Sequence, residues 1–481
     1  MSNLGLDIAA SGISAQQSLL DTAAQNLANV STPGYAQETV NLTTQPSESA
    51  SGVGEGVLIT SVTGQTSDLF ESLNDIAAGQ LGAANQAQSV QNAAQEAFPE
   101  PSTTGLSSQL DQLFSDLSSL ATEPSNSAAA ATVVQDASQV ASTLNSTYQQ
   151  LATTSSQLLD DLQGTGGSGE GLLGQANQLI NQIAQLNTGI MAGVGGNDSP
   201  NGLIDQRRQA VNQLANLLGV TATSQSNGSL TVSLNGVQLV SGTTASDLQT
   251  AGGSGGTPLT LQTAGGAAAA AGGEIGSLLT GYNTTIPTYQ AQLSGVSDAL
   301  ATSLNALQSG GVSANGTPGP TSSAATGWTG SLLPGALFVN EGSSTTYTTG
   351  AASAATIAVN PSLLSDPSLL ATASGSSTAG QPTIDATTVQ QMAAVGQQSG
   401  GPTTLYQSLV GLVGSQTQQA NDVQASAQTL SDNATANLSS VEGVDTNTQT
   451  VNVLSAQDAY QATAQVISAI NDSLQSLLEA V

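Results

Sequence analysis

A seven-residue hydrophobic repeat runs to the end of this 481-residue chain. Its steps alternate between three and four residues, which places the side chains along one narrow stripe of a helix. A second stripe recurs every seven residues near the N-terminus. The C-terminal stripe consists of Val453, Ala456, Tyr460, Thr463, Ile467, Ile470, Leu474, Leu477 and Val481, and the N-terminal stripe of Leu6, Ile13, Leu20 and Leu27. Because narrow stripes are typical of paired helices, we predict that the two ends pair with each other or with neighbouring subunits.

The middle of the chain alternates between helical and strand periodicity. Between 220 and 241 the hydrophobic period is two, and Asn235-Gly236 predicts a two-residue hairpin turn. Residues 310–384 are rich in Gly, Ser, Thr and Pro, with short β-like runs such as ALFV and ATIAV. Hydrophobic residues at helical spacing predict helices over 133–162, 172–190, 203–218, 274–308 and 386–438.

These patterns predict an α+β fold that is mainly α. We expect an elongated multi-domain protein with paired, coiled-coil-like terminal helices, a helical stem and inserted β-rich segments. The expected domains are nested. They are a terminal helical domain of residues 1–60 with 440–481, a helical stem of 61–219 with 274–310 and 385–439, a β-hairpin segment of 220–273, and an irregular β-rich outer region of 311–384.

The composition excludes most catalytic chemistry. The chain has 32 acidic residues against two basic ones, Arg207 and Arg208, and it contains no His, Cys or Lys. Catalytic triads with histidine, thiol nucleophiles, Schiff bases, P-loops and ordinary zinc sites are therefore impossible, and no cofactor or metal is expected. The formal charge of −30 also argues against nucleic acid and anionic membranes as partners, because no basic patch can neutralise phosphates.

Carboxylate chemistry is the remaining enzymatic possibility. Two carboxylates can serve as acid and base in a glycosidase. The most visible pair, Asp160-Asp161, would point in different directions on a helix, so a solvated face is the better interpretation. We therefore expect no enzymatic activity, and a secreted acidic carboxylate glycosidase is the minor alternative. Arg208 follows Asp205 by three residues, which predicts an ion pair on a helix surface.

The chain carries no sign of membrane insertion. Its start, MSNLGLDIAASGIS, has neither a basic region nor an unbroken apolar region, so a cleaved secretory signal is not expected. No stretch approaches 18 consecutive apolar residues. At a pH of about 3 most carboxylates would be protonated, so the surface would carry little net charge. That property would suit an acidic external medium.

Residues 26–35, NLANVSTPGY, end the first helical pattern abruptly. A residue that precedes proline avoids the helical region, and Pro33 has no amide donor, so Thr32-Pro33 predicts a helix end. Pro33-Gly34 suits the two central positions of a type II turn. Tyr35 can then anchor the returning chain on the helix.

Several of these stretches resemble one protein family. NLANVSTPGY (26–35) and AQDAYQATAQVISAINDSLQSLL (456–478) are similar to the two ends of axial flagellar proteins, the rod, hook and hook-associated group. Four segments, three in the middle of the chain and one leading into its last helix, resemble the hook–filament junction family within that group. They are GLIDQRRQAVNQLANLLGVTATSQSNGSLTVSLNGVQLVSG (202–242), GGEIGSLL (272–279), VGLVGSQTQQA (410–420) and SSVEGVDTNTQTVNVLSAQDAYQA (439–462).

This resemblance implies a structural protein of the bacterial flagellum that joins hook to filament by self-assembly through its terminal helices. Its partners would be copies of itself, the hook protein, a second hook–filament junction protein, and a cytosolic export chaperone at the C-terminal helix. It would be extracellular and exported through the flagellum's own channel without a cleaved signal. The basic residues usual in the family are nearly absent, so apolar and amide contacts would replace salt bridges between subunits.

The residues expected to serve subunit assembly belong to the two stripes and to the turn. Another flagellar axial protein, of hook or rod, is the alternative function. The expected assembly residues are Leu6, Ile13, Leu20, Leu27, Asn29, Pro33, Gly34, Tyr35, Val453, Tyr460, Ile467, Ile470, Leu474 and Leu477.

Overall fold

The computed structural model describes residues 2–46, 54–194, 200–253, 257–321, 331–374 and 385–479. Across these residues the chain is mainly helical and carries small antiparallel sheets, so the predicted mainly α fold class is confirmed. The chain divides into two compact units. Unit 1 contains Met1–Ala84, Gly169–Gly276 and Gln424–Val481, and unit 2 contains Asn85–Ser168 and Ser277–Val423. The expected four-domain division stays a prediction.

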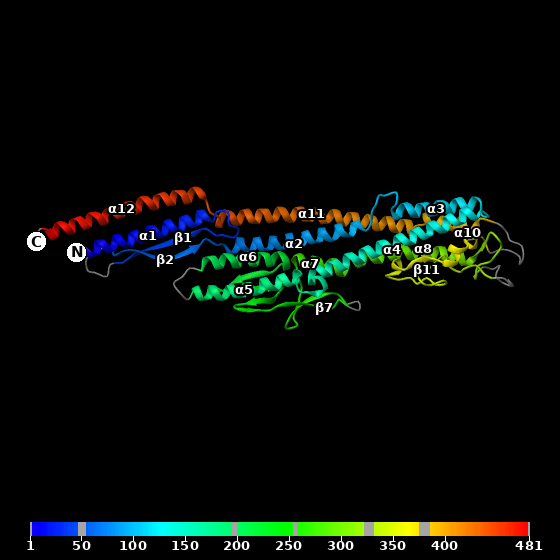
Figure 1. The fold of residues 1–481 in the computed structure, drawn as a ribbon, viewed down its shortest axis with the longest axis horizontal. Helices are drawn as coiled ribbons and strands as arrows, with labels where there is room; N and C mark the ends of the chain where they lie inside the picture. The colour runs from blue at the N-terminus through cyan, green and yellow to red at the C-terminus, as the bar shows by residue number, and fades with distance from the viewer. Residues whose placement is uncertain are drawn as a thin grey trace. The chain divides into compact units, whose positions relative to one another are not determined.

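In unit 1 the two ends of the chain pair as antiparallel helices (Figure 1). Helix α1 spans Ser2–Ala28 and α12 spans Thr446–Glu479. Gly5 lies against Ile470, Gly12 lies against Thr463, and Asn26 donates to Gln449 at 3.3 Å. Each step of seven along α1 is therefore matched by a step of seven back along α12. This register is the one expected of a heptad pair, so the predicted pairing of the ends occurs within one chain.

A β-hairpin packs on α1 and was not predicted from the sequence. Strand β1 (Glu38–Gln45) pairs with β2 (Gly56–Gly64), and the Val57 N–H donates to Ser11 Oγ of α1 at 3.2 Å. Its side chains are mostly exposed or half-buried, so the usual alternation of apolar and polar residues is weak here. The contact of the hairpin with α1 explains why it is stable as a two-stranded sheet.

The rest of unit 1 places two helices beside two small sheets. Helix α6 ends at Gly219, which has a left-handed φ of 68° and donates its N–H to Ala215 O at 2.6 Å. Asn235 and Gly236 have φ values of 46° and 88°, as a type I′ turn requires, so the predicted hairpin is confirmed. The elements are α5 (Leu172–Val194), α6 (Asn201–Leu218), β3 (Thr221–Ser224), β4 (Leu230–Leu234), β5 (Val237–Ser241), β6 (Thr244–Ala245), β7 (Leu248–Ala251), β8 (Thr260–Thr263) and β9 (Ala268–Ala269).

Asn187 fastens α5 to the sheet. It is fully buried, and its side-chain amide donates to Leu230 O at 2.8 Å and to Gly242 O at 2.7 Å. Its carbonyl oxygen accepts from Leu230 N at 3.0 Å and from Arg207 Nη1 at 2.9 Å. Every hydrogen-bonding position of this buried amide is therefore used.

Unit 2 has a leucine-rich helical core with small sheets beside it. Tyr289 is fully buried, its ring meets the edge of Phe98 at 6.4 Å, and its hydroxyl donates to Gln91 at 2.7 Å. The predicted β-like runs ALFV and ATIAV contain two paired strands, β11 and β12. The elements are α3 (Leu106–Thr122), α4 (Ser127–Gln163), α8 (Ile286–Gly310), β10 (Gly311–Ser313), β11 (Phe338–Asn340), β12 (Ile357–Val359), α9 (Pro361–Ser365), β13 (Ala371–Ser374) and α10 (Thr387–Ala394).

Two helices contribute residues to both units. Helix α2 (Asp68–Glu96) and helix α11 (Pro402–Glu442) are tied to each other by Thr435 to Asn74 in unit 1 and by Gln88 to Asn421 in unit 2. The segment predicted as one helix over 386–438 is broken before α11, where Gly400 takes a φ of 75° and is followed by Gly401 and Pro402. Helix α7 (Gly273–Thr280) continues through a π-helical turn into α8, in place of one uniform helix over 274–308.

Candidate functional site

Three connecting segments of the chain, which we call the crossings, meet in unit 1 where α1 ends and α12 begins. They are the turn that follows α1, the link from β2 to α2, and the break between α11 and α12. We call the polar network that holds them the joint. The joint consists of Asn26, Tyr35, Glu71, Asp205, Arg208, Glu442 and Gln449.

The turn after α1 has the geometry that its sequence predicts. Tyr35 donates its backbone N–H to Thr32 O at 3.2 Å, and Gly34 has a φ of 79°, so Pro33 and Gly34 occupy the centre of a type II turn. The Tyr35 hydroxyl donates to Asn26 Oδ1 of α1 at 2.8 Å. The predicted anchoring of Tyr35 on the first helix is thus confirmed.

Asn26 connects this turn to α12. It is buried, accepts the Glu38 N–H at 2.8 Å, and donates to Glu38 O at 2.9 Å and to Gln449 Oε1 at 3.3 Å. One side-chain amide therefore fixes the start of β1 and the first part of α12 to the end of α1. Its neighbour Leu27, which the heptad stripe favoured, is 41% exposed.

Glu442, the last residue of α11, contacts all three crossings. It is 4% exposed. Its carboxylate accepts the Ser67 N–H at 2.7 Å, and its backbone carbonyl accepts the Gln37 N–H at 2.8 Å. It also forms an ion pair with Arg208 Nη1. Its side chain and backbone together therefore tie the end of α11 to the segments before β1 and before α2.

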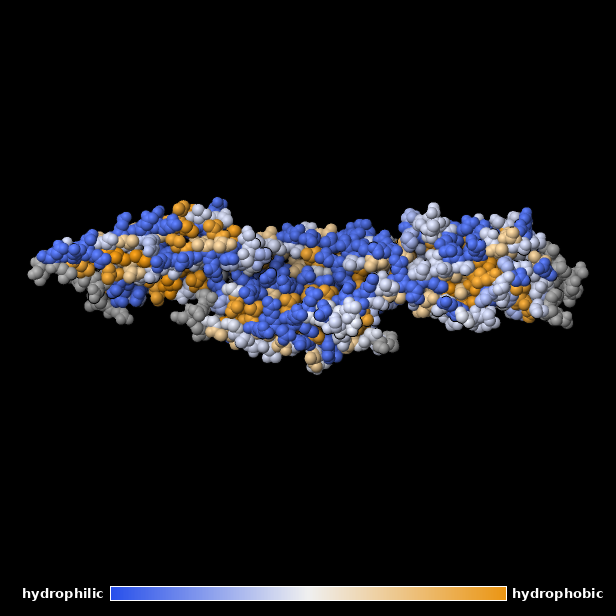
Figure 2. All heavy atoms as spheres, viewed as in Figure 1, coloured by the Kyte–Doolittle hydropathy of each residue, from blue (hydrophilic) through white to orange (hydrophobic). Residues whose placement is uncertain are grey.

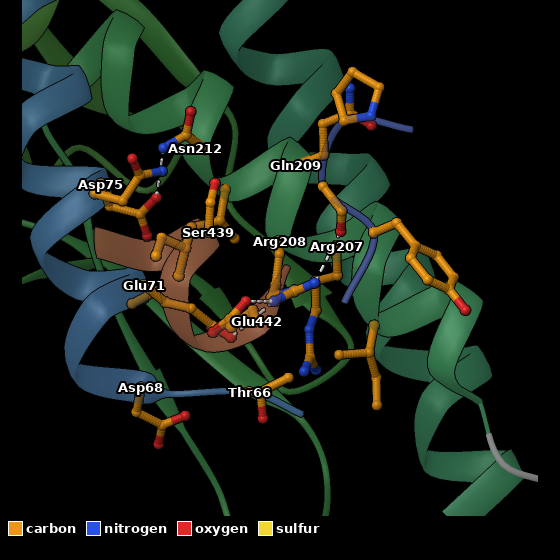
Figure 3. Close-up of a pocket in the computed structure, with 18 of the residues that line it drawn as sticks. Thr66, Asp68, Glu71, Asp75, Arg207, Arg208, Gln209, Asn212, Ser439 and Glu442 are labelled. Atoms are coloured by element: carbon orange, nitrogen blue, oxygen red, sulfur yellow. Dashed lines mark hydrogen bonds and ion pairs between the residues drawn. The ribbon is translucent and has the colours of Figure 1, made fainter. Parts of the chain in front are cut away.

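Arg208 completes the joint from α6 (Figure 3). Besides Glu442, it bonds to Asp205 at 2.7 Å, to Glu71 at 3.2 Å and to the carbonyl of Gly34 at 2.8 Å. The predicted pair of Asp205 and Arg208 is therefore present, but it is not an ordinary surface pair. Its guanidinium links α2, α6, α11 and the turn after α1, and in the described part of the chain every ion pair involves this residue.

Arg207 has a different role. It is 8% exposed and donates through Nη1 to Asn187 Oδ1 at 2.9 Å and to Gly228 O at 2.8 Å. These contacts hold α6 to α5 and to the turn that precedes β4. Burial lowers the pKa of Arg207, although the guanidinium keeps its charge at any ordinary pH.

The carboxyls of the joint are electrostatically crowded. Burial raises the pKa of Glu71 to about 7; Arg208 opposes this rise and Glu442 adds to it. Burial also raises the pKa of Asp205, against the lowering effects of Arg208 and of a backbone bond from Ala36. One turn further along α2, burial raises the pKa of Asp75 to about 6, although its side chain accepts a hydrogen bond from Asn212.

A hollow of about 1300 Å³ opens beside the joint. The turn after α1, the first turns of α2, helix α6 and the end of α11 all contribute to its wall (Figure 3). Five acids line it against two arginines, and they are Asp68, Glu71, Asp75, Glu442 and Asp445. The charged side chains of its wall are therefore mainly acidic, and the described residues hold no cluster of acidic side chains suited to a metal ion.

The structure separates the expected assembly residues into two groups. On α12, the predicted stripe is the face turned from solvent, because Val453, Tyr460, Ile467, Ile470 and Leu474 are half-buried between exposed neighbours. On α1, the buried side chains are Ala9, Ala15, Ala23 and Asn26 instead. Leu6, Ile13, Leu20, Asn29 and Tyr35 are half-buried, whereas Pro33 and Gly34 are exposed. The side chain of Leu477 lies outside the described residues.

No sequence pattern predicted that Glu71, Glu442 and Gln449 act together. A signal was nevertheless present. A chain with only two cations and 32 acids can neutralise few buried carboxylates. Any buried carboxylates are therefore expected close to Arg207 or Arg208. Glu442 also lies within SSVEGVD, one of the stretches that carried the family resemblance.

Gly34 offers a first test of the turn. Replacing Gly34 with Ala should lower the free energy of unfolding by about 1 kcal/mol, because a φ of 79° strains any residue with a Cβ. Gly202 is the matched control, since a Cβ there meets no atom within 4 Å and α6 should tolerate alanine. Thermal unfolding of both variants measures the difference, and equal melting temperatures would contradict the strained turn.

None of the described helices combines the length and the hydropathy needed to cross a membrane.

Three family profiles match the chain. "Flagellar hook-associated protein FlgK helical domain" matches residues 91–321, "Flagella basal body rod protein" matches 6–35, and "Flagellar basal body rod FlgEFG protein C-terminal" matches 439–480.

Individual relatives agree with these profiles. Flagellar hook-associated protein 1 of Escherichia coli (strain K12) is 26% identical over 254 residues, which are 52% of this chain and 45% of that protein. The protein of the same name from Bacillus subtilis (strain 168) is 29% identical over 200 residues, which are 38% of each chain. The one from Salmonella typhimurium is 26% identical over 339 residues, 66% of this chain and 59% of that protein.

The chain thus spans about half the length of the curated relatives that it matches. Among solved structures, the flagellar hook junction protein FlgK from Burkholderia pseudomallei aligns with a TM-score of 0.45 and 27% identity. That alignment covers 57% of this chain and 47% of the other.

Proposed function

We propose that this chain, which resembles the FlgK hook-associated proteins along its middle and the axial rod proteins at both ends, is a structural subunit that joins hook to filament in the bacterial flagellum. One observation carries the proposal. The two end segments that match axial profiles, 6–35 and 439–480, are the segments that pack together as α1 and α12. A paired element made from opposite ends of the chain is suited to assembly, because it presents one surface to neighbouring copies.

The outer face of this pair carries apolar side chains that no part of the described chain covers. Val451 is 60% exposed, Leu454 is 56% exposed and Val466 is 51% exposed on α12. Hydrophobic residues also gather over this region in the space-filling view (Figure 2). Clustered exposed apolar side chains mark contact surfaces. In a tubular assembly they would meet a different patch on the next copy, which is a heterologous contact.

The expected assembly residues take their place in this proposal. The half-buried stripe of α12 holds the pair together, while Leu27 and the turn at Pro33 and Gly34 remain accessible to neighbours. Further partners would be the hook protein, a second hook–filament junction protein, and a cytosolic export chaperone at the C-terminal helix. The protein would lie outside the cell, after export through the flagellum's own channel, and would have no enzymatic activity.

Another axial protein, of hook or rod, is the second candidate. The end profiles favour it equally, because both are named for rod proteins. The FlgK helical-domain match over 91–321 favours the junction role. The two candidates differ in which part of the flagellum should be missing when the protein is absent.

Deletion of the gene gives the decisive test. Cells without this chain should assemble hooks that carry no filament and should release unattached flagellin into the medium. Electron microscopy of the cell surface and an immunoblot of the medium measure both effects, and restoring the full-length gene is the control. Cells without hooks would indicate a rod or hook protein instead, and normal filaments would contradict any junction role.

A further inference from the structure

The joint holds more negative charge than its cation can balance. Arg208 faces three carboxylates, from Glu71, Asp205 and Glu442. The Arg208 side chain is 14% exposed, and those three side chains are 24%, 17% and 5% exposed, so water screens the group only weakly. Like charges that share a site disfavour full ionisation, and one member of the group then takes up a proton more readily than a free carboxyl.

The hydrogen bonds identify which carboxyl this is. Glu442 accepts the Ser67 N–H at 2.7 Å in addition to its bond from Arg208, and Asp205 accepts a backbone bond from Ala36. Within the described residues, Arg208 at 3.2 Å is the only hydrogen-bond partner of the Glu71 carboxylate. Of the three carboxylates, Glu71 therefore has the fewest hydrogen-bond donors in the described residues.

The charged groups around Glu71 come from each element packed against it. Helix α6 supplies two cations and one acid, the end of α11 supplies one acid, and α2 itself supplies another. These groups are Arg207, Arg208, Glu442 and Asp68, with Asp205, which shares the Arg208 guanidinium with Glu71. Three surrounding acids against two arginines leave a negative balance before Glu71 ionises, so a proton on Glu71 reduces repulsion in the joint.

We propose that Glu71 is a proton-operated latch of the joint. With a proton on Glu71, Glu442 and Arg208 hold the turn after α1, the start of α2 and the α11–α12 break together. When the proton leaves, repulsion between Glu71 and Glu442 loosens the three crossings, and with them the base of the terminal helix pair. The pKa of about 7 at Glu71 would place this change close to neutral pH. The latch requires no flagellar partner.

The direction of the pH effect follows from linkage. The pKa of Glu71 is higher in the folded chain than the ordinary value of 4.5, so the folded joint binds the proton more tightly than the unfolded chain does. Stability of the joint therefore increases as pH falls through about 7 toward 4.5. Above about pH 7 the effect levels off, because Glu71 is then ionised in both the folded and the unfolded chain.

Hydrogen exchange of the full chain tests the latch. The amides of Gln37 and Ser67 both donate to Glu442, so they report whether the joint is closed. After correction for intrinsic exchange rates, the protection factors of these two amides should fall about tenfold between pH 6 and pH 8. With a pKa of about 7 in the folded chain, Glu71 loses its proton over this range, and the stability lost corresponds to about one pKa unit, which is a factor of ten. Protection of core amides in unit 2 should change far less over the same range.

Two variants separate Glu71 from its surroundings. Glu71→Gln mimics the protonated acid, so protection of the Gln37 and Ser67 amides should become independent of pH and remain high at pH 8. Asp75→Asn is the matched control, because Asp75 lies on the same helix and is also buried, yet pairs with Asn212 outside the joint. It should keep most of the wild-type slope, because a pKa of about 6 leaves Asp75 mostly ionised between pH 6 and pH 8. A wild-type joint whose protection does not change with pH, or a Glu71→Gln variant that retains the slope, would overturn the proposal.

Discussion

Removal of residues 470–481 should abolish assembly at the hook–filament junction. In the structure Ile470 lies against Gly5, so the last turns of α12 cover the first turns of α1. Without that cover α1 has few bulky apolar side chains of its own, and isolated helices of this kind are marginal in water. In cells that lack the wild-type gene, the truncated chain should restore no filaments. Electron microscopy counts filaments for each strain.

A second variant separates the outer contact from the fold of the pair. Val466→Asn removes an apolar side chain that is 51% exposed on α12, and it should reduce filament-bearing hooks while the circular dichroism spectrum stays unchanged. The neighbouring Gln465→Asn is the matched control and should assemble normally, because Gln465 is exposed and already polar. If the truncated chain still supports filaments, the terminal pair does not mediate assembly.

Replacing Asn187 with Ala should lower the stability of unit 1 by about 3 kcal/mol. The change removes four hydrogen bonds at once and leaves half-buried backbone groups of Leu230 and Gly242 without these partners. It also leaves the buried guanidinium of Arg207 with one acceptor fewer. Unsatisfied buried groups and partly unpaired charges account for the largest losses seen in single substitutions.

Asn181 provides the comparison on the same helix. It is exposed, and its side chain donates to Asn177 O at 2.9 Å and to Asp247 Oδ1 at 2.8 Å. Asn181→Ala should therefore cost no more than about 0.5 kcal/mol, as is usual for surface positions. Hydrogen exchange of amides in α5 and α6 measures both variants. Similar losses in the two would show that Asn187 does not fasten α5 to the sheet.

Periodicity and turn chemistry predicted most of the helices and one hairpin. The heptad steps of α12, the left-handed end of α6 at Gly219 and the Asn235-Gly236 turn depend on local sequence, so a reader of the sequence can find them. The hairpin of β1 and β2 was missed because its side chains are mostly solvent-exposed. The buried seam of α1 was missed because it is built from alanine, which is common on every face of this helix.

The joint depends on contacts that local patterns do not encode. Asn26 and Gln449 are 423 residues apart, and Arg208 and Glu442 are 234 apart, so only the fold brings them together. The turn could be read in full because Thr32, Pro33 and Gly34 determine its backbone through their own dihedral limits. The role of the turn in the joint could not be predicted from the sequence, because Arg208 reaches the carbonyl of Gly34 from a helix that is distant in the sequence.

Both arginines of the chain lie in α6 with side chains largely withdrawn from water. Trypsin-like proteases cut only after Lys or Arg, so they find just two bonds in all 481 residues, and both are within one helix. Cleavage there requires α6 to unfold locally, since a protease needs an extended substrate. The folded chain should therefore withstand this class of digestive enzyme. A single nick between the two arginines or after the second would mark the moment at which α6 opened.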